Sequence, residues 1–169
     1  MCVGIEALHR LADGPSMPET PVFLFSRPVR TGHMEYELVD LDDVPVTDLS
    51  GVESVPPDLN IRPVGEHLGL SEMRATVWYF DPGEEIQYHA HSEQEELYFV
   101  LEGAFSLKLG RSGETEYVDA GPGTFWVAEP KVGHGHRNVG DDRGVVLSFG
   151  APPVDDPGLN PHDLEHAEF

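Results

Sequence analysis

The pattern that most constrains this chain lies in residues 83–138, where glycines bracket two groups of side chains of the kind that bind metals. The first group begins at Gly83 and reads G-x5-H-x-H-x4-E-x6-G, and the second begins at Gly123 and reads G-x10-H-x3-N. The candidate ligands in the two groups are His89, His91, Glu96 and His134.

Two histidines separated by one residue project from the same face of an extended strand, because strand side chains alternate with a period of two. His89 and His91 can therefore bind one ion together. Glu96 would follow after a short turn, and His134 would come from a strand further along the chain. Three imidazole nitrogens and one carboxylate oxygen suit Mn, Fe, Co, Ni, Cu or Zn, so we expect one divalent transition metal per chain.

The two groups, with Pro130 ahead of His134, resemble the two conserved motifs of the cupin superfamily. The segment GPGTFWVAEPKVGHGHRNVGDD is similar to the second cupin motif along its whole length. One departure is visible, because a Lys-Val-Gly tripeptide separates Pro130 from the histidine, where cupins commonly have Pro-Gly closer to it. The resemblance covers residues 73–150 and implies an all-β fold, the cupin-type double-stranded β-helix or jelly-roll barrel. It does not define a substrate.

Metal-dependent cupin dioxygenases and decarboxylases use a set of three histidines and one glutamate. The resemblance therefore implies a metal-dependent oxidoreductase acting on a small oxygenated metabolite, with Fe or Mn favoured over Zn, Ni, Co and Cu. A sugar or sugar-phosphate isomerase is an alternative, although only Lys131, Arg137 and Arg74 lie near the motifs to bind a phosphate. A non-enzymatic cupin that binds a small molecule is the other alternative.

Glu95 competes with Glu96 for the role of carboxylate ligand. Strand alternation would place Glu95 on the apolar face that begins with Leu97, whereas Glu96 keeps the six-residue spacing to Gly103. We therefore expect Glu96 to be the ligand.

His136 and Tyr98 are the candidate proton-transfer residues. His136 stands two positions after His134 and should point into the same cavity, and an imidazole titrates at a pKa of about 6.5. A core histidine beside Asn138 is the alternative interpretation of His136. Tyr98 alternates with Glu96 in the same way. Further candidates for the substrate pocket are Gln87, Trp126 and Phe149.

The charge of the chain is strongly one-sided, with 31 acidic residues against 10 basic ones and a net charge of -21. Such a surface repels nucleic acids and anionic membranes, so we expect neither as a partner. Acidic, lysine-poor proteins remain soluble in concentrated salt, where the Debye length falls to about 3 Å at 1 M. We therefore expect a halophilic cytoplasm, with an ordinary acidic bacterial protein as the alternative.

The acidic excess is confined to residues 34–169, because residues 1–33 hold three acids and three bases. The first 33 residues are therefore either an extension ahead of a native start at Met34 or an arm that packs on the barrel. The predicted organisation is an N-terminal extension, a loop-rich lead-in with one short strand, a barrel and a C-terminal arm, at residues 1–33, 34–72, 73–150 and 151–169.

Glycine and proline, with 18 and 15 residues, cut the chain into short apolar runs that are typical of an all-β domain. Eight strands are predicted, at residues 74–80, 86–90, 96–101, 104–109, 115–118, 124–128, 134–138 and 144–149. In the C-terminal arm, we interpret Asp155 and Asp156 as a solvated turn and predict a short helix capped by Asn160.

Two further expectations concern the environment of the protein. The chain has no run of about 18 apolar residues and no secretory leader, and its only cysteine, Cys2, cannot form an internal disulfide, so we expect a cytoplasmic protein.

The strand that carries Glu96 has a second apolar face, which is formed by Leu97, Phe99 and Leu101. Because a single barrel has only one interior, either the lead-in over residues 34–72 or a second subunit must bury this face. Related small cupins commonly dimerise, so we expect a homodimer.

Overall fold

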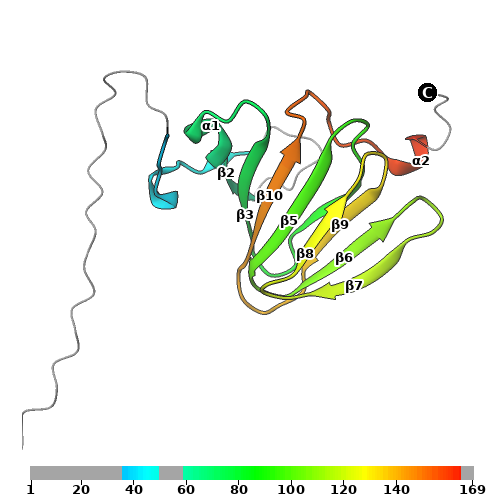
Figure 1. Ribbon diagram of the computed structural model, residues 1–169. Coiled ribbons are helices and arrows are strands. Elements are labelled where there is room, and N and C mark those ends of the chain that lie inside the picture. Colours follow the sequence, from blue (N-terminus) through cyan, green and yellow to red (C-terminus); the bar gives the residue numbers. More distant parts are fainter. Residues whose placement is uncertain (1–35, 50–58, 165–169) are drawn as a thin grey trace, which may run out of the picture. The chain divides into compact units, whose positions relative to one another are not determined.

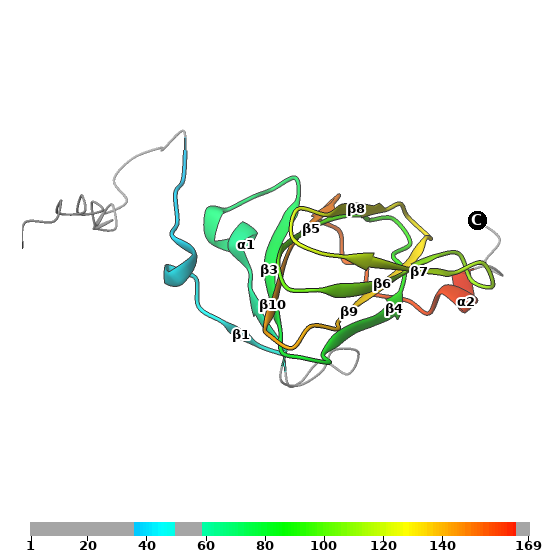
Figure 2. The ribbon, with the colours of Figure 1, turned by 90° about the horizontal axis from the view of Figure 1, so that it is seen from below.

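The computed structural model describes residues 36–49 and 59–164, so the predicted extension over residues 1–33 lies outside the described residues. The described chain forms two antiparallel β-sheets that face one another, with three short helices around them (Figures 1 and 2). This confirms the predicted all-β jelly-roll fold. Within the same ranges, no helix is long and apolar enough to cross a membrane.

The larger sheet has six strands in the order β1-β2-β3-β10-β5-β8, and the smaller has four in the order β4-β9-β6-β7. The strands of the larger sheet are β1 (Thr47–Asp48), β2 (Asn60–Arg62), β3 (Arg74–Phe80), β10 (Gly144–Ala151), β5 (Glu95–Glu102) and β8 (Phe125–Ala128). Those of the smaller sheet are β4 (Glu85–His89), β9 (Gly133–Asn138), β6 (Phe105–Gly110) and β7 (Glu116–Ala120). The helices are η1 (Leu41–Asp43), α1 (Val64–Leu68) and α2 (Pro161–Leu164).

All eight predicted strands are present, with ends that differ from the prediction by no more than two residues. The lead-in was predicted to hold one short strand, and it contains two strands, β1 and β2, together with the helices η1 and α1. Helix α2 begins where it was predicted, and the Asn160 side chain accepts a hydrogen bond from the backbone N–H of His162 at 3.1 Å.

The hydrophobic core lies between the two sheets. Phe80 of β3 and Phe105 of β6 meet there edge to face, with ring centroids 5.5 Å apart. On β5, Val100 is completely buried and belongs to this core, whereas the preceding inward positions are Tyr98 and Glu96. The barrel interior therefore changes from a packed core at one end of β5 to polar groups at the other.

Close approach of β4 to β9 depends on two glycines that flank His134. A Cβ atom on Gly133 would lie 2.2 Å from the Tyr88 hydroxyl oxygen, and one on Gly135 would lie 2.9 Å from the carbonyl oxygen of Ile86. No real Cβ makes such contacts without displacing its neighbour. The glycines thus allow β4 to lie against β9 at the position where His134 faces inward.

A β-bulge in β4 sets the direction of His89. The pairing with β9 shifts register between Ile86 and His89, so that two residues of β4 stand opposite Gly135 alone. The bulge breaks the strict alternation that the sequence analysis assumed for Gln87 and His89. Gln87 is consequently exposed, whereas His89 is only partly accessible.

Candidate metal centre

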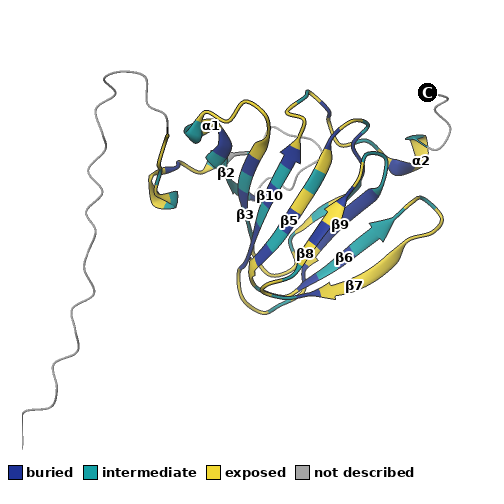
Figure 3. Cartoon of the chain, in the orientation of Figure 1, coloured by how far each residue is buried: buried dark blue, intermediate teal, exposed yellow. Residues whose placement is uncertain are grey.

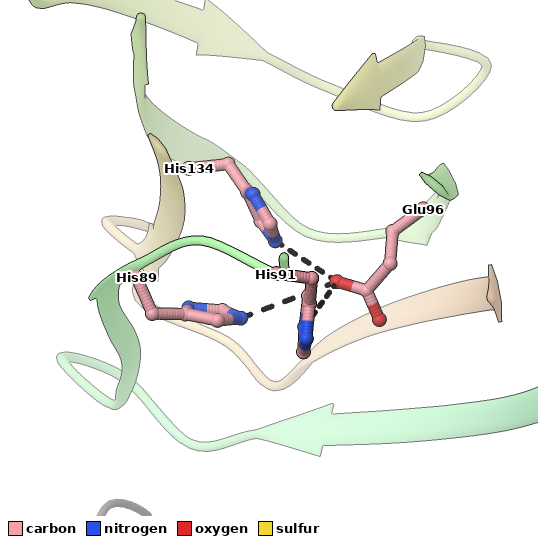
Figure 4. A group of neighbouring side chains, drawn as sticks. All are labelled: His89, His91, Glu96 and His134. Carbon is pink, nitrogen blue, oxygen red and sulfur yellow. Dashed lines mark hydrogen bonds and ion pairs between the residues drawn. The ribbon is translucent and has the colours of Figure 1, made fainter. Parts of the chain in front are cut away.

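The structure brings together the four residues that the sequence predicted as metal ligands. One ligand atom from each of them lies within 4.8 Å of the others. His89 ends β4, His91 follows it, Glu96 lies on β5 and His134 on β9 (Figure 4). Glu95, the competing carboxylate, is exposed.

A single carboxylate oxygen forms the middle of this cluster. Glu96 Oε2 lies 2.9 Å from Nε2 of His134, 3.2 Å from Nε2 of His91 and 4.0 Å from Nε2 of His89. Figure 4 shows the three rings converging on this oxygen from different directions.

The opposite ring nitrogens are all held by the backbone. Nδ1 lies 2.8 Å from a carbonyl oxygen in His89, 2.7 Å in His91 and 3.1 Å in His134. These carbonyls belong to Gln87, Asp156 and Val132. Because a carbonyl oxygen only accepts hydrogen bonds, each Nδ1 carries a proton and each Nε2 points its lone pair at the middle of the cluster.

This arrangement fits a bound cation. Neutral imidazoles protonated at Nδ1 have no proton on Nε2 to donate to Glu96, so the short distances require either doubly protonated rings or a cation between the lone pairs. A divalent transition metal would satisfy three imidazole nitrogens and one carboxylate oxygen together. The cluster can therefore hold a metal, and the binding of one remains a prediction.

Burial and the mutual contacts of the ligands shift their pKa values. Burial by itself raises the pKa of Glu96, but the close contacts of its carboxylate with the rings of His134 and His91 outweigh burial and hold that pKa well below its usual range. Burial lowers the pKa of His91, but the neighbouring Glu96 carboxylate raises it by more, so the pKa of His91 lies above its usual value. The pKa of His89 falls to about 4, because of burial and then of the nearby His134.

Tyr98 binds the ligand carboxylate directly. Its hydroxyl donates a hydrogen bond of 2.5 Å to Glu96 Oε2, and its ring stacks on Trp126 with centroids 4.7 Å apart. Burial, and then the charge of Glu96, raises the pKa of Tyr98 well above its usual value. Tyr98 therefore stays protonated and holds Glu96 in position.

His136 lies deeper in the barrel, among aromatic rings. Its ring centroid is 5.0 Å from that of Phe80, 5.3 Å from Tyr98 and 5.5 Å from Trp126, and the residue is 2% exposed. Neither of its ring nitrogens has a hydrogen-bond partner among the described residues. Burial, and then the neighbouring His134, lowers the pKa of His136 to about 3, so the ring is neutral at neutral pH. His136 is thus both a core residue and an unpaired polar group.

The cluster opens on a cavity of about 1050 Å³ that is lined by both sheets, by helix α1 and by the C-terminal arm. Its wall includes His136 and Tyr98 from the interior, Trp78 from β3 and Ile86 from β4. Arg74 is the only lysine or arginine among the described residues that line it, and its guanidinium donates to the carbonyl of Val154 at 2.5 Å. The cavity therefore has little positive charge to offer an anion.

The three residues predicted for the substrate pocket have different positions. Gln87 lines the cavity at its exposed rim. Trp126 does not line it, because Tyr98 is stacked against its ring. Phe149 does not line it either, since strand alternation on β10 turns the preceding Ser148 inward, where it accepts a 2.9 Å hydrogen bond from the indole N–H of Trp78.

Asp156 has a role in the site that no sequence pattern indicated. The predicted solvated turn at Asp155 and Asp156 is wrong for the second residue, which is 6% exposed. Its carboxylate accepts hydrogen bonds from the loop between His91 and Glu96. No spacing rule connects an aspartate in the C-terminal arm with a loop more than 60 residues earlier in the chain.

Comparison with known proteins agrees with this geometry. Residues 76–150 match the family model of the cupin domain. The chain contains a cupin domain. All four residues of the ligand cluster lie within this domain, as the motif resemblance implied.

Known proteins similar to this cupin differ in what they do. It is 33% identical over 98 residues to the polyketide synthase CurC of Streptomyces cyaneus. The aligned region covers 58% of this chain and 56% of CurC. The match thus spans little more than half the length of CurC. The solved structure of the polyketide cyclase RemF from Streptomyces resistomycificus has a TM-score of 0.59, with 23% identity over 73% of this chain and 84% of that chain.

A predicted oxalate decarboxylase from Thermotoga maritima has a similar fold. Its TM-score is 0.58, with 15% identity over 69% of this chain and 99% of that chain. At these identities the two solved structures establish a shared fold and leave the reaction open.

Proposed function

We propose that this cupin is a metal-dependent enzyme acting on an uncharged, oxygenated and largely apolar metabolite of the polyketide kind. The observation that carries the proposal is that His89, His91 and Glu96 of the ligand cluster lie on the wall of a cavity of about 1050 Å³. The lining of this cavity is mixed and includes the aromatic and aliphatic side chains of Trp78, Tyr98 and Ile86. Ligand cavities usually measure about 300 to 1,000 Å³, so a multi-ring molecule would fit. The similarity to a polyketide synthase supports the same substrate class.

The residues around the cavity would divide the work between them. A divalent metal held by His89, His91, Glu96 and His134 would polarise a carbonyl or phenolic oxygen. Tyr98 keeps Glu96 in place through its hydroxyl. His136 offers one ring nitrogen as an acceptor and the other as an N–H donor, which suits it to hold a substrate oxygen or to move a proton.

Ring closure is the reaction that this site supports best. A proton leaves the carbon next to a carbonyl group, that carbon attacks a second carbonyl carbon of the same molecule, and water is lost. The reaction needs no co-substrate and no positively charged pocket. A sugar phosphate is disfavoured, because Arg74 is the only arginine or lysine among the described lining residues and already bonds to Val154.

Oxygenation is the second candidate reaction, and the observation that supports it is the set of metal ligands. Two or three histidines with one carboxylate and an open position are also the ligands of non-haem iron oxygenases. The identity of the bound metal and the uptake of oxygen separate the two reactions.

Purified protein, prepared without a metal-affinity step, would be analysed for metal and then incubated with linear and partly cyclised poly-β-keto compounds, diols, keto acids and phenols. We expect a product lighter by one water without oxygen uptake. Oxygen uptake with an oxygen-containing product would replace cyclisation by oxygenation. Ligand binding without turnover on any of these compounds, with metal bound, would favour the non-enzymatic alternative and refute the enzyme proposal.

A further inference from the structure

Residues 152–160, which we term the C-terminal strap, lie beyond the region that matches the cupin family model. The strap crosses the segment that follows β4. Leu159 and Ala90 exchange two backbone hydrogen bonds there, of 3.0 and 2.9 Å. The strap therefore runs beside the two histidines of the first motif.

Asp156 is the most heavily bonded residue of the strap. Its carboxylate accepts four hydrogen bonds of 2.7 to 3.1 Å. The donors are the backbone N–H groups of Ser92, Glu93 and Gln94 and the hydroxyl of Ser92. The carboxylate thus fixes the loop that joins His91 to Glu96.

The backbone of the same residue orients a ligand. The carbonyl oxygen of Asp156 accepts the 2.7 Å hydrogen bond from Nδ1 of His91, which directs Nε2 of that ring toward Glu96. One strap residue therefore controls both the direction of His91 and the path of the loop to the next ligand.

A second strap residue packs against another ligand. A Cβ atom on Gly158 would lie 2.8 Å from Cδ2 of His89, so the strap backbone lies directly against this ring. The strap is also anchored at its other end, where the side-chain amide of Gln94 donates to the carbonyl of Pro152 at 2.9 Å. Two of the three histidine rings are held between the barrel and the strap.

We propose that the C-terminal strap is a positioning element of the metal centre: it supplies no ligand, but Asp156 and Gly158 hold His91 and His89 in the orientation that binds the ion. This inference rests on the proposed metal site. Positioning groups of this kind commonly change metal affinity by about 10- to 100-fold, so loss of the strap contacts should weaken binding on that scale.

The chain offers a matched pair of variants for the test. Asp156→Ala removes the buried carboxylate, and Asp155→Ala removes the same charge from the exposed neighbour. Affinity for Zn²⁺ and Co²⁺ would be measured by competition with a chromophoric chelator, and the visible spectrum of the Co²⁺ form would report the ligand geometry. We expect Asp156→Ala to bind both ions about 10- to 100-fold more weakly with an altered Co²⁺ spectrum, and Asp155→Ala to match the unmodified protein.

Gly158→Ala serves as the second variant if Asp156→Ala does not fold. It leaves the Asp156 contacts in place but pushes on the ring of His89, so it should weaken metal binding while circular dichroism of the metal-free protein stays unchanged. Asp156→Asn, which keeps the shape and part of the acceptor capacity, should bind metal with intermediate affinity.

Equal affinities in folded Asp156→Ala, Gly158→Ala and unmodified protein would overturn the positioning role and leave the metal site standing. An unmodified protein that binds neither ion would instead refute the proposed metal site itself. The two failures are therefore distinct.

Discussion

At the scale of single residues, the position of one proton decides what each histidine of this barrel can do. His89, His91 and His134 carry it on Nδ1, facing a carbonyl oxygen, and so present Nε2 as a ligand. His136, on the same strand as His134, has no such carbonyl within hydrogen-bonding distance and remains unpaired among the described residues. Residues of one type thus have separate roles, as ligands and as a cavity group.

Removal of a histidine of the cluster should remove the metal. His91→Ala or His134→Ala deletes one nitrogen donor and leaves Glu96 with fewer partners, so we expect most of the metal to be lost and the midpoint of thermal unfolding to fall. Elemental analysis and thermal denaturation would measure both. His67→Ala, in helix α1 and outside the cluster, is the control that should keep its metal. Stoichiometric metal in the His91→Ala and His134→Ala double variant would refute the site.

The role of His136 can be separated from metal binding. His136→Phe fills similar space with an apolar ring among Phe80, Tyr98 and Trp126, and removes two unpaired polar atoms from the interior. We expect unchanged metal content and unchanged or higher thermal stability, with turnover at least about tenfold lower. Unchanged turnover would make His136 a core residue only, and loss of metal would show that it belongs to the ligand set.

At the scale of elements, the sequence predicted what depends on local periodicity and missed what depends on distant contacts. The eight barrel strands and the choice of Glu96 over Glu95 followed from alternation and spacing along the chain. The bulge that leaves Gln87 exposed at the rim of the cavity depends on strand pairing, and so does the choice of which alternating face of β10 is turned inward. Asp156 acquires its role only when the C-terminal arm meets the loop after His91, and no local pattern marks that contact.

The approach of β4 to β9 predicts the effect of one methyl group. In Gly135→Ala the new Cβ would lie 2.9 Å from backbone atoms of Ile86 and Tyr88, which cannot rotate away as a side chain can. Overpacking of this kind typically costs about 1 to 3 kcal/mol of stability, and the displaced strands carry His89 and His134. We expect a lower midpoint of thermal unfolding and weaker metal binding. Gly121→Ala, whose new Cβ would meet nothing within 4 Å, is the control that should change neither.

At the scale of the whole molecule, the outer face of the larger sheet is covered on one side only. Beside β3, the guanidinium of Arg62 donates to the carbonyls of Leu41 and Val44 at 2.6 and 2.7 Å, which ties the lead-in to the sheet, and Val44 is buried. Over β5 and β8, no described residue covers the apolar side chains, and Figure 3 shows exposed positions along both strands. Leu97, Leu101, Phe125 and Val127 are 39 to 63% exposed there.

We propose that a second copy of the chain covers this face. An identical subunit fits this face better than a nucleic acid or a membrane, because the net charge of -21 repels both and the patch itself is apolar. Phe125 stacks on Phe99 with ring centroids 4.2 Å apart, so the patch is already ordered within one subunit. Screening by salt at molar concentration would reduce the repulsion between two such acidic subunits.

The dimer can be tested with one substitution on each sheet. Phe125→Glu places a charge in the apolar patch and should convert the protein to a monomer with its metal content intact. Tyr117→Glu, at a similarly exposed aromatic residue on β7 of the other sheet, should leave the protein dimeric. Light scattering after gel filtration in several molar KCl would give the mass of each. The repulsion between the acidic subunits is weakest in that salt, so a monomeric mass for the unmodified protein there would count decisively against the second copy.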